Sequence, residues 1–116
     1  MVVDLDFDLF NEKVNKISND SGTWKYRGKK PCIISFESPW DKNSIIQSKI
    51  VDCIALKYKA ELCVYRINTE FEKELCRLLG VVNKPSIFLI PLKGFPQTNY
   101  MVPDEESLTE LVRNLL

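Results

Sequence analysis

The stretch that decides the fold is Pro31-Cys32-Ile33-Ile34-Ser35-Phe36, followed by Ser38-Pro39-Trp40-Asp41-Lys42-Asn43-Ser44. Residues 31–36 are apolar at both alternating positions except at Ser35, which is typical of a strand covered on both faces of a parallel sheet. In the second run, Asp41 stands where a side-chain oxygen can accept hydrogen bonds from the free N–H groups of a following helix. We therefore expect a buried central strand, a turn and a helix that begins after Asp41.

The rest of the chain alternates between expected strands and expected helices. Strands are expected at residues 2–5, 62–67, 86–90 and 97–102, the last two joined by a turn at Lys93-Gly94. Helices are expected where apolar residues recur at intervals of three and four: Phe7, Phe10, Val14 and Ile17; Ile46, Ile50, Cys53, Ile54 and Leu56; Phe71, Leu75, Leu78 and Leu79, ended by Gly80; and Leu108, Leu111, Val112 and Leu115. The order β-α-β-α-β-α-β-β-α predicts a three-layer α/β/α sandwich, a central mixed sheet flanked by helices, as one domain over residues 1–116.

Composition limits the classes of function. The 116 residues are 45% apolar and carry 16 basic and 16 acidic residues, so the zero net charge argues against binding nucleic acid by neutralising phosphates. The local exception is the run Trp24-Lys25-Tyr26-Arg27-Gly28-Lys29-Lys30, for which a small anion or nucleic-acid patch is the alternative to a solvated loop. No segment approaches the roughly 18 apolar residues of a membrane span, and the acidic start MVVDLDFDLF has no signal-peptide pattern. We expect a cytoplasmic protein that binds neither nucleic acid nor membrane.

The sequence contains four cysteines, Cys32, Cys53, Cys63 and Cys76, and no histidine. The lack of histidine excludes imidazole catalysis and Cys2His2 zinc sites, and no two cysteines have Cys-x-x-Cys spacing. Because these residues fall on expected strands and on the apolar faces of expected helices, we expect inert core thiols and no metal or other cofactor. A disulfide between Cys32 and Cys63, on neighbouring strands, is the alternative, and it depends on geometry.

Taken together, the motifs along the chain resemble the thioredoxin family, especially its Bacteroidetes-type members. The matching segments are Trp24-Lys25-Tyr26-x-Gly28-x-Lys30-Pro31, Ile33-Ile34-Ser35-Phe36, Trp40, Lys57-Tyr58, Val64-Tyr65-Arg66-Ile67-Asn68, Gly80-Val81, Pro85-Ser86 and Phe88-Leu89-Ile90-Pro91-x-x-Gly94-x-Pro96-Gln97. They extend over nearly the whole chain, from Phe7 to Leu116. The resemblance implies a thioredoxin-like fold and a cis peptide bond before Pro85.

The resemblance fails at the residues that carry thioredoxin chemistry. Where the family has Trp-Cys-Gly-Pro-Cys, this chain has Trp40-Asp41-Lys42-Asn43-Ser44. Asp41 and Ser44 thus take the cysteine positions, and neither a carboxylate nor a hydroxyl can replace a low-pKa thiolate or the thiol that resolves a mixed disulfide. Four further family positions differ: the buried acid aligns with Ser35, the helix-kinking proline with Lys49, the residue before the cis-proline with Lys84, and a groove glycine with Met101. These changes indicate a loss of dithiol exchange, so we expect no catalytic residue.

The leading hypothesis is a redox-inactive binding module. By resemblance, the loop before Pro85 lies against the start of the helix after Trp40, so the predicted binding residues are Trp40, Asp41, Lys42, Lys84, Pro85 and Met101, and the partner is an extended polypeptide. A simpler interpretation is that Asp41 only caps the helix and Trp40 only packs. Two other functions stay open: a thiol-disulfide oxidoreductase of cell redox homeostasis that uses a non-standard cysteine, and a purely structural domain. The sequence does not define the oligomeric state.

Overall fold

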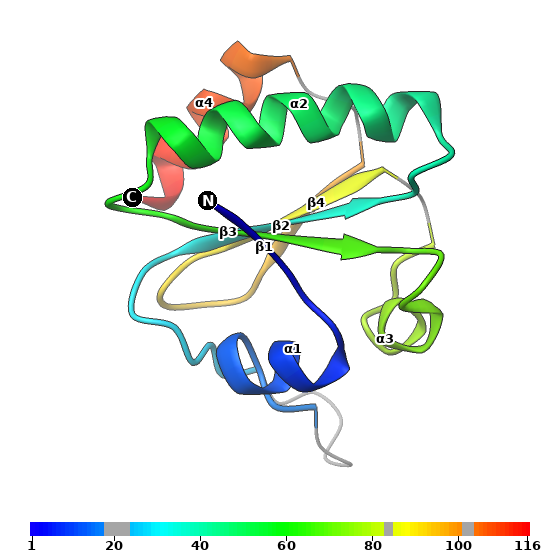
Figure 1. Ribbon diagram of the computed structural model, residues 1–116. Coiled ribbons are helices and arrows are strands. Elements are labelled where there is room, and N and C mark those ends of the chain that lie inside the picture. Colours follow the sequence, from blue (N-terminus) through cyan, green and yellow to red (C-terminus); the bar gives the residue numbers. More distant parts are fainter. Residues whose placement is uncertain (18–23, 83–84, 101–103) are drawn as a thin grey trace.

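The computed structural model describes residues 1–17, 24–82, 85–100 and 104–116 of the chain. Its elements are β1 (Val2–Asp4), α1 (Phe7–Lys13), β2 (Cys32–Glu37), α2 (Lys42–Lys57), β3 (Cys63–Asn68), α3 (Lys73–Leu78), β4 (Ser86–Ile90), β5 (Gln97–Asn99) and α4 (Glu105–Leu115). This order matches the one expected from the sequence. The helices lie on both sides of the sheet, so the molecule has three layers (Figure 1).

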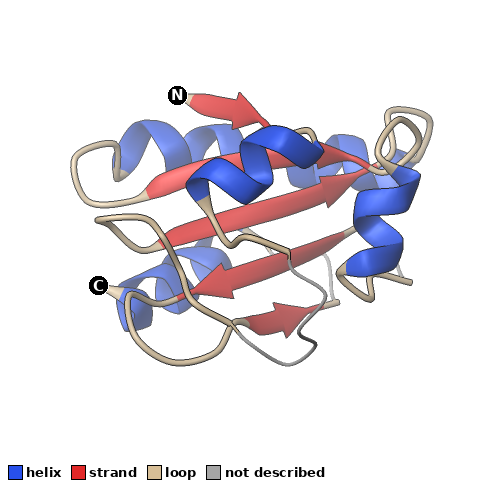
Figure 2. Cartoon of the chain, turned by 90° about the horizontal axis from the view of Figure 1, so that it is seen from below, coloured by secondary structure: helices blue, strands red, loops and turns tan. Residues whose placement is uncertain are grey.

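The strands form one five-stranded sheet in the order β1-β3-β2-β4-β5. β3 runs parallel to β1 and to β2, whereas β4 is antiparallel to β2 and β5 is antiparallel to β4. Figure 2 shows this mixed sheet from the side covered by α1. β2 is therefore the central strand, as its apolar sequence predicts, and every one of its residues is buried.

Two hydrophobic cores lie on opposite faces of the sheet. Alternating residues of β2 divide between them: Ile34 and Phe36 pack on the face of α1 and α3, and Ile33 packs on the face of α2 and α4. On the first face, the rings of Phe36 and Phe88 are 4.7 Å apart between centroids and tilted by 59°, a separation typical of aromatic pairs that attract each other. This double burial explains why β2 is apolar at consecutive positions.

The predicted helical faces are partly wrong, most clearly in α2. Its buried residues are Ser44, Gln47, Val51, Ile54 and Ala55, whereas Ile46, Cys53 and Leu56, which we expected to be buried, are exposed. Apolar residues surround this helix, so their spacing does not define one face. The face that packs on the sheet is instead rotated to include two polar side chains that find partners there.

The ends of the helices follow their expected signals more closely. Gly80 ends α3 with φ +73°, a left-handed conformation that glycine adopts at little cost. Phe71, expected on the apolar face of that helix, precedes it and is exposed, as is Leu78. In α1, Phe10 is buried as expected, but Phe7 is exposed.

Candidate functional site

The turn between β2 and α2 is fixed by side-chain hydrogen bonds from both ends. The carboxylate of Asp41 accepts a hydrogen bond from the backbone N–H of Ser44 (2.9 Å), so Asp41 is the N-cap of α2, as predicted. Ser44 Oγ in turn accepts a hydrogen bond from the backbone N–H of Ser38 (3.0 Å), and this serine is only 1% exposed. Both side chains therefore take part in building the turn.

Trp40 occupies this turn and is 80% exposed, which is unusual for the largest apolar side chain. Lys42 beside it is exposed, and Asp41 is half-buried. Because the hydrogen bonds of Asp41 and Ser44 fix the turn, the backbone of Trp40 is held in place while its side chain lies in solvent.

Pro85 lies at the same end of the sheet as the Trp40 turn. It immediately precedes β4, whose first residue, Ser86, is the register partner of Phe36 near the end of β2. Pro85 is buried. The other two predicted binding residues, Lys84 and Met101, lie outside the described residues, as does the expected cis bond between Lys84 and Pro85. The structure thus brings Pro85 close in the sheet to the segment that carries Trp40, Asp41 and Lys42.

The connection from β3 to α3 lies beside the same turn, a proximity that the residue pattern did not predict. The backbone N–H of Thr69 donates to the carbonyl of Glu37 (2.9 Å), and the Ser38 hydroxyl donates to the Glu70 carboxylate (3.1 Å). Phe71 follows directly and is exposed. A second exposed aromatic side chain therefore belongs to the loops at this end of the sheet.

A hollow of about 480 Å³ lies along the same connection and the residues that follow α3. It is lined by Thr69, Glu70, Lys73, Cys76, Arg77, Gly80, Val81 and Val82. The apolar residues at its rim include the exposed Val82. Two of its lining residues, Thr69 and Glu70, directly precede Phe71 in the chain.

A buried polar network lies under the turn, on the face of the sheet covered by α2. The Ser35 hydroxyl donates to Glu37 Oε2 (2.5 Å), and Gln47 Nε2 donates to Ser35 Oγ (2.9 Å) and to the carbonyl of Ser86 (3.1 Å). Gln47 Oε1 and Ser86 Oγ are buried and have no hydrogen-bond partner among the described residues. Ser35 was singled out from the sequence, but Gln47 was missed; its spacing of four and seven residues from Val51 and Ile54 is the signal that could have placed it on the buried face.

Arg66 connects this network to the surface. Its guanidinium donates from Nε to Glu37 Oε1 (2.9 Å) and from Nη2 to Asp52 Oδ1 (3.0 Å). Burial alone would lower the pKa of Arg66, but the hydrogen bond to Asp52 and the charge of Glu37 outweigh it, and the net shift is upward. The guanidinium is therefore a permanent cation that neutralises the buried Glu37 carboxylate.

None of the four cysteines, all of which lie among the described residues, is in a disulfide, but they do not share one environment. Cys32 and Cys76 are buried, in line with the expected core thiols, whereas Cys63 is only half-buried. Cys53 is exposed, which corrects that expectation, because the buried face of α2 is rotated away from it. None of the four lies in the turn that carries Asp41 and Ser44.

Across residues 1–17, 24–82, 85–100 and 104–116, no group of three or more cysteine, aspartate or glutamate side chains is arranged to hold a metal ion. Within those same ranges, no helix combines the length and apolar character needed to cross a bilayer.

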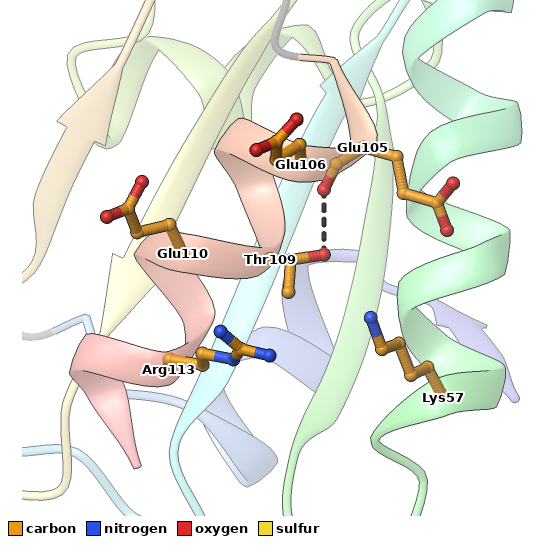
Figure 3. Close-up of a pocket in the computed structure, with 6 residues that line it drawn as sticks. All are labelled: Lys57, Glu105, Glu106, Thr109, Glu110 and Arg113. Carbon is orange, nitrogen blue, oxygen red and sulfur yellow. Dashed lines mark hydrogen bonds between the residues drawn. The ribbon is translucent and has the colours of Figure 1, made fainter.

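Another depression lies elsewhere, between α2 and α4, with a volume of about 580 Å³ (Figure 3). It is lined by Lys57, Glu105, Glu106, Thr109, Glu110 and Arg113. Within it, the Thr109 hydroxyl donates to the Glu105 carbonyl (2.7 Å), which is an ordinary hydrogen bond within a helix. The lining combines both signs of charge and includes no residue of the Trp40 turn.

Comparisons with known proteins agree on the fold. No protein-family model matches the chain. A curated thioredoxin from Borreliella burgdorferi is 27% identical over 114 residues, which cover 98% of this chain and 97% of that protein. The crystal structure of chloroplastic thioredoxin z superposes with a TM-score of 0.80 at 15% identity, covering 98% of this chain and 93% of that one. A structure described as a malarial protein gives a TM-score of 0.69 at 18% identity, covering 76% of this chain and 99% of that one.

These matches, with the mixed sheet and its flanking helices, define the class: the chain has a thioredoxin-like fold. The match to a curated thioredoxin over almost the full length of both chains supports the resemblance to the thioredoxin family.

Proposed function

We propose that this protein is a thioredoxin-like module that performs no dithiol exchange at the Trp40 turn and instead binds an extended polypeptide there. The observation that carries the proposal is the Trp40 side chain, 80% exposed on a turn that is held rigid beneath it. An exposed tryptophan on a fixed support is the kind of residue that dominates binding at protein interfaces, because it buries a large area at a small entropic cost.

The relatives named thioredoxin point towards a redox function, and the proposal departs from them for a chemical reason. Asp41 and Ser44, which the family resemblance aligns with the redox cysteines, are the two side chains that hold the turn. An aspartate carboxylate cannot form a mixed disulfide, and the Ser44 hydroxyl is buried and already hydrogen bonded. This turn therefore supplies shape and charge and no sulfur nucleophile.

Recognition in this proposal combines one aromatic contact with backbone pairing. Trp40 covers an apolar side chain of the peptide, and Lys42 and Asp41 offer one charge of each sign beside it. The segment at Pro85 pairs with the extended backbone of the peptide, in the manner of strand addition. Lys84 and Met101 complete the surface by resemblance to the family. Phe71, from the neighbouring connection, extends it.

The first test is reduction of insulin by dithiothreitol in the presence of wild type or of the Asp41→Cys/Ser44→Cys double variant. Wild type is expected to reduce insulin no faster than buffer, since the turn has no thiol. Activity that appears only in the double variant indicates that the scaffold is intact and lacks only its sulfur atoms. Thioredoxin-like turnover by wild type contradicts the proposal.

The second test measures binding directly. Peptides selected from a random display library on the wild-type protein are titrated against wild type and Trp40→Ala by calorimetry. We expect the variant to bind at least about ten-fold more weakly, as for a binding hot spot. Phe95→Ala is the matched control, because Phe95 is also an exposed aromatic (71%) but lies in the connection between β4 and β5, at the other end of the sheet. Equal affinity for wild type and Trp40→Ala rejects the proposed surface.

A further inference from the structure

Cys32 and Cys63 are register partners at the first positions of the neighbouring parallel strands β2 and β3. Adjacent strands are about 4.8 Å apart, and disulfide-bonded cysteines have Cα atoms about 4.4–6.8 Å apart. Both side chains point to the same face of the sheet, because both pack in the core that contains Tyr65. The backbone therefore holds the Cα atoms of Cys32 and Cys63 at a separation within the range of disulfide-bonded cysteines.

The ends of the two strands allow the small movement that closure requires. The Cβ atoms of a disulfide are closer together, at about 3.5–4.5 Å, than the spacing of flat strands provides. Each cysteine is the first residue of its strand, preceded by a connection and not by further ladder. The Cys63 N–H donates to the carbonyl of Pro31 (3.0 Å), which keeps the two chain segments together at this point.

The two thiols differ in their access to solvent. Cys63 is half-buried, whereas Cys32 is fully buried. The pKa of the Cys32 thiol is raised to about 12, mainly by burial; the hydrogen-bonding contact with Tyr26 acts to lower it, and the neighbouring Cys63 raises it. Cys63 is thus the thiol that an external reagent meets first, and Cys32 can react only with a sulfur that is already beside it.

The segment before β2 covers this pair. Tyr26 packs on the same core, and its hydroxyl donates to the carbonyl of Lys30 (2.6 Å) while lying next to Cys32. Gly28 leaves the room for this arrangement, because a Cβ atom there would collide with the hydroxyl and ring of Tyr26. Any larger residue at Gly28 therefore displaces the ring that shields Cys32.

We propose that Cys32 and Cys63 form a reversible dithiol–disulfide site that is oxidised by low-molecular-weight disulfides. The Cys63 thiolate attacks one sulfur of the disulfide RSSR, forms the mixed disulfide Cys63–S–SR and releases RS⁻, which takes up the proton lost by Cys63. The Cys32 thiolate then attacks the Cys63 sulfur, forms the protein disulfide and releases the second RS⁻, which takes up the proton of Cys32. The protein loses two electrons and two protons, and RSSR becomes two RSH. This site is separate from the proposed peptide surface.

The test uses the full chain with Cys53→Ser, because the exposed Cys53 would otherwise react by itself. The protein is incubated with oxidised glutathione, blocked with N-ethylmaleimide and analysed by intact mass and peptide mapping. We expect a species that lacks two hydrogens, carries no glutathione and yields the linked Cys32–Cys63 peptide. Adding Cys32→Ser should stop the reaction at a stable glutathione adduct on Cys63, and adding Gly28→Ala should speed closure several-fold by moving Tyr26.

Several outcomes overturn the proposal. One is a protein that stays fully reduced under these conditions. Another is a wild-type pair that accumulates glutathione on Cys63 without closing, or a disulfide that joins a different pair of cysteines. If Cys32→Ser does not fold, as judged by circular dichroism, the peptide map of the Cys53→Ser protein alone decides, because it identifies which cysteines are linked.

Discussion

Replacing Arg66 by methionine should destabilise the protein by removing the cation that faces a buried carboxylate. The Arg66 side chain is 22% exposed and the Glu37 side chain 9% exposed, and they meet at 2.9 Å. Methionine keeps most of the apolar stem of arginine, so the change removes mainly the charge and its hydrogen bonds. Without Arg66, the described partner that still donates to the Glu37 carboxylate is the Ser35 hydroxyl.

The expected magnitude follows from the burial of the pair. Breaking a fully buried ion pair by removing one partner costs about 3–5 kcal/mol, and the partial exposure of Arg66 together with the remaining Ser35 bond reduces this to about 2–3 kcal/mol. The corresponding fall in Tm is roughly 10 °C for a domain of this size. The measurement is urea unfolding at neutral pH, followed by far-ultraviolet circular dichroism, with the free energy of unfolding extrapolated to water.

Two further variants separate this explanation from simple loss of packing. Asp52 also binds Arg66, but its side chain is 60% exposed, so Asp52→Asn should change the free energy of unfolding by no more than about 0.5 kcal/mol. The double variant Glu37→Gln/Arg66→Met should recover at least half of the loss, because no uncompensated charge remains. If Arg66→Met costs no more than Asp52→Asn, or if the double variant recovers nothing, the carboxylate does not depend on Arg66 and the reasoning is wrong.

Three other predictions concern the turn, the cysteines and α4. Asp41→Ala should lower the free energy of unfolding by about 1 kcal/mol through loss of the α2 cap, whereas Trp40→Ala should change it by less than about 0.5 kcal/mol in the same urea titration, since that side chain is exposed. Linking Cys32 to Cys63 closes a loop of about 30 residues and should raise the free energy of unfolding by up to about 3–4 kcal/mol, seen as a higher urea midpoint. An unchanged or lower midpoint would show that closure strains the sheet. Hydrogen bonding by the Ser107 N–H holds the pKa of Asp104 below its ordinary 3.8, so its stabilising charge is complete above that pH and is lost as the pH falls through the folded-state pKa. The Tm difference between wild type and Asp104→Asn should therefore be present near pH ~6 and vanish near pH ~2, and a difference that does not vary with pH would contradict this.

The sequence was sufficient to predict the architecture because strong local signals agree with one another. The continuous apolar run of β2 can be satisfied only by a strand covered on both faces, and that strand is central in the sheet. The N-cap at Asp41 and the left-handed Gly80 also follow from local chemistry alone. These features depend on residues close together in the chain, which is why they could be predicted.

The spacing of the apolar residues alone did not predict the buried face of α2, because the burial of its polar side chains depends on partners from other elements. Gln47 is buried because Ser35 and the Ser86 carbonyl accept its hydrogen bonds, and Ser44 is buried because the Ser38 N–H donates to it. A polar side chain without such partners would remain in solvent. The periodicity argument counts only apolar residues, so it predicted that Cys53 is buried, whereas in the structure it is exposed.

The candidate site was predicted in part for the same reason. Asp41 has the role expected of it, and Trp40 and Pro85 belong to segments that meet at one end of the sheet, as the family resemblance implies. The structural role of Ser44 and the proximity of Phe71 depend on long-range contacts and were missed. The register of Cys32 with Cys63 is likewise a property of the sheet, since a shift by one residue would place the two thiols on opposite faces.

The two proposed sites lie at opposite ends of β2. Five residue steps at about 3.3 Å separate Cys32 from Glu37, so the cysteine pair is roughly 16 Å from the point where the Trp40 turn begins. Between them, β2 is buried on both faces and paired on both edges, with β3 and with β4. Closing a disulfide at the first residue of β2 should not displace its last residue, because each residue between them is held by its own hydrogen bonds and packing. Oxidation of the cysteines should therefore stabilise the sheet without altering the surface around Trp40. The two ends of β2 are thus structurally independent, so a cysteine pair at its first residue does not depend on cysteines in the turn that follows its last residue.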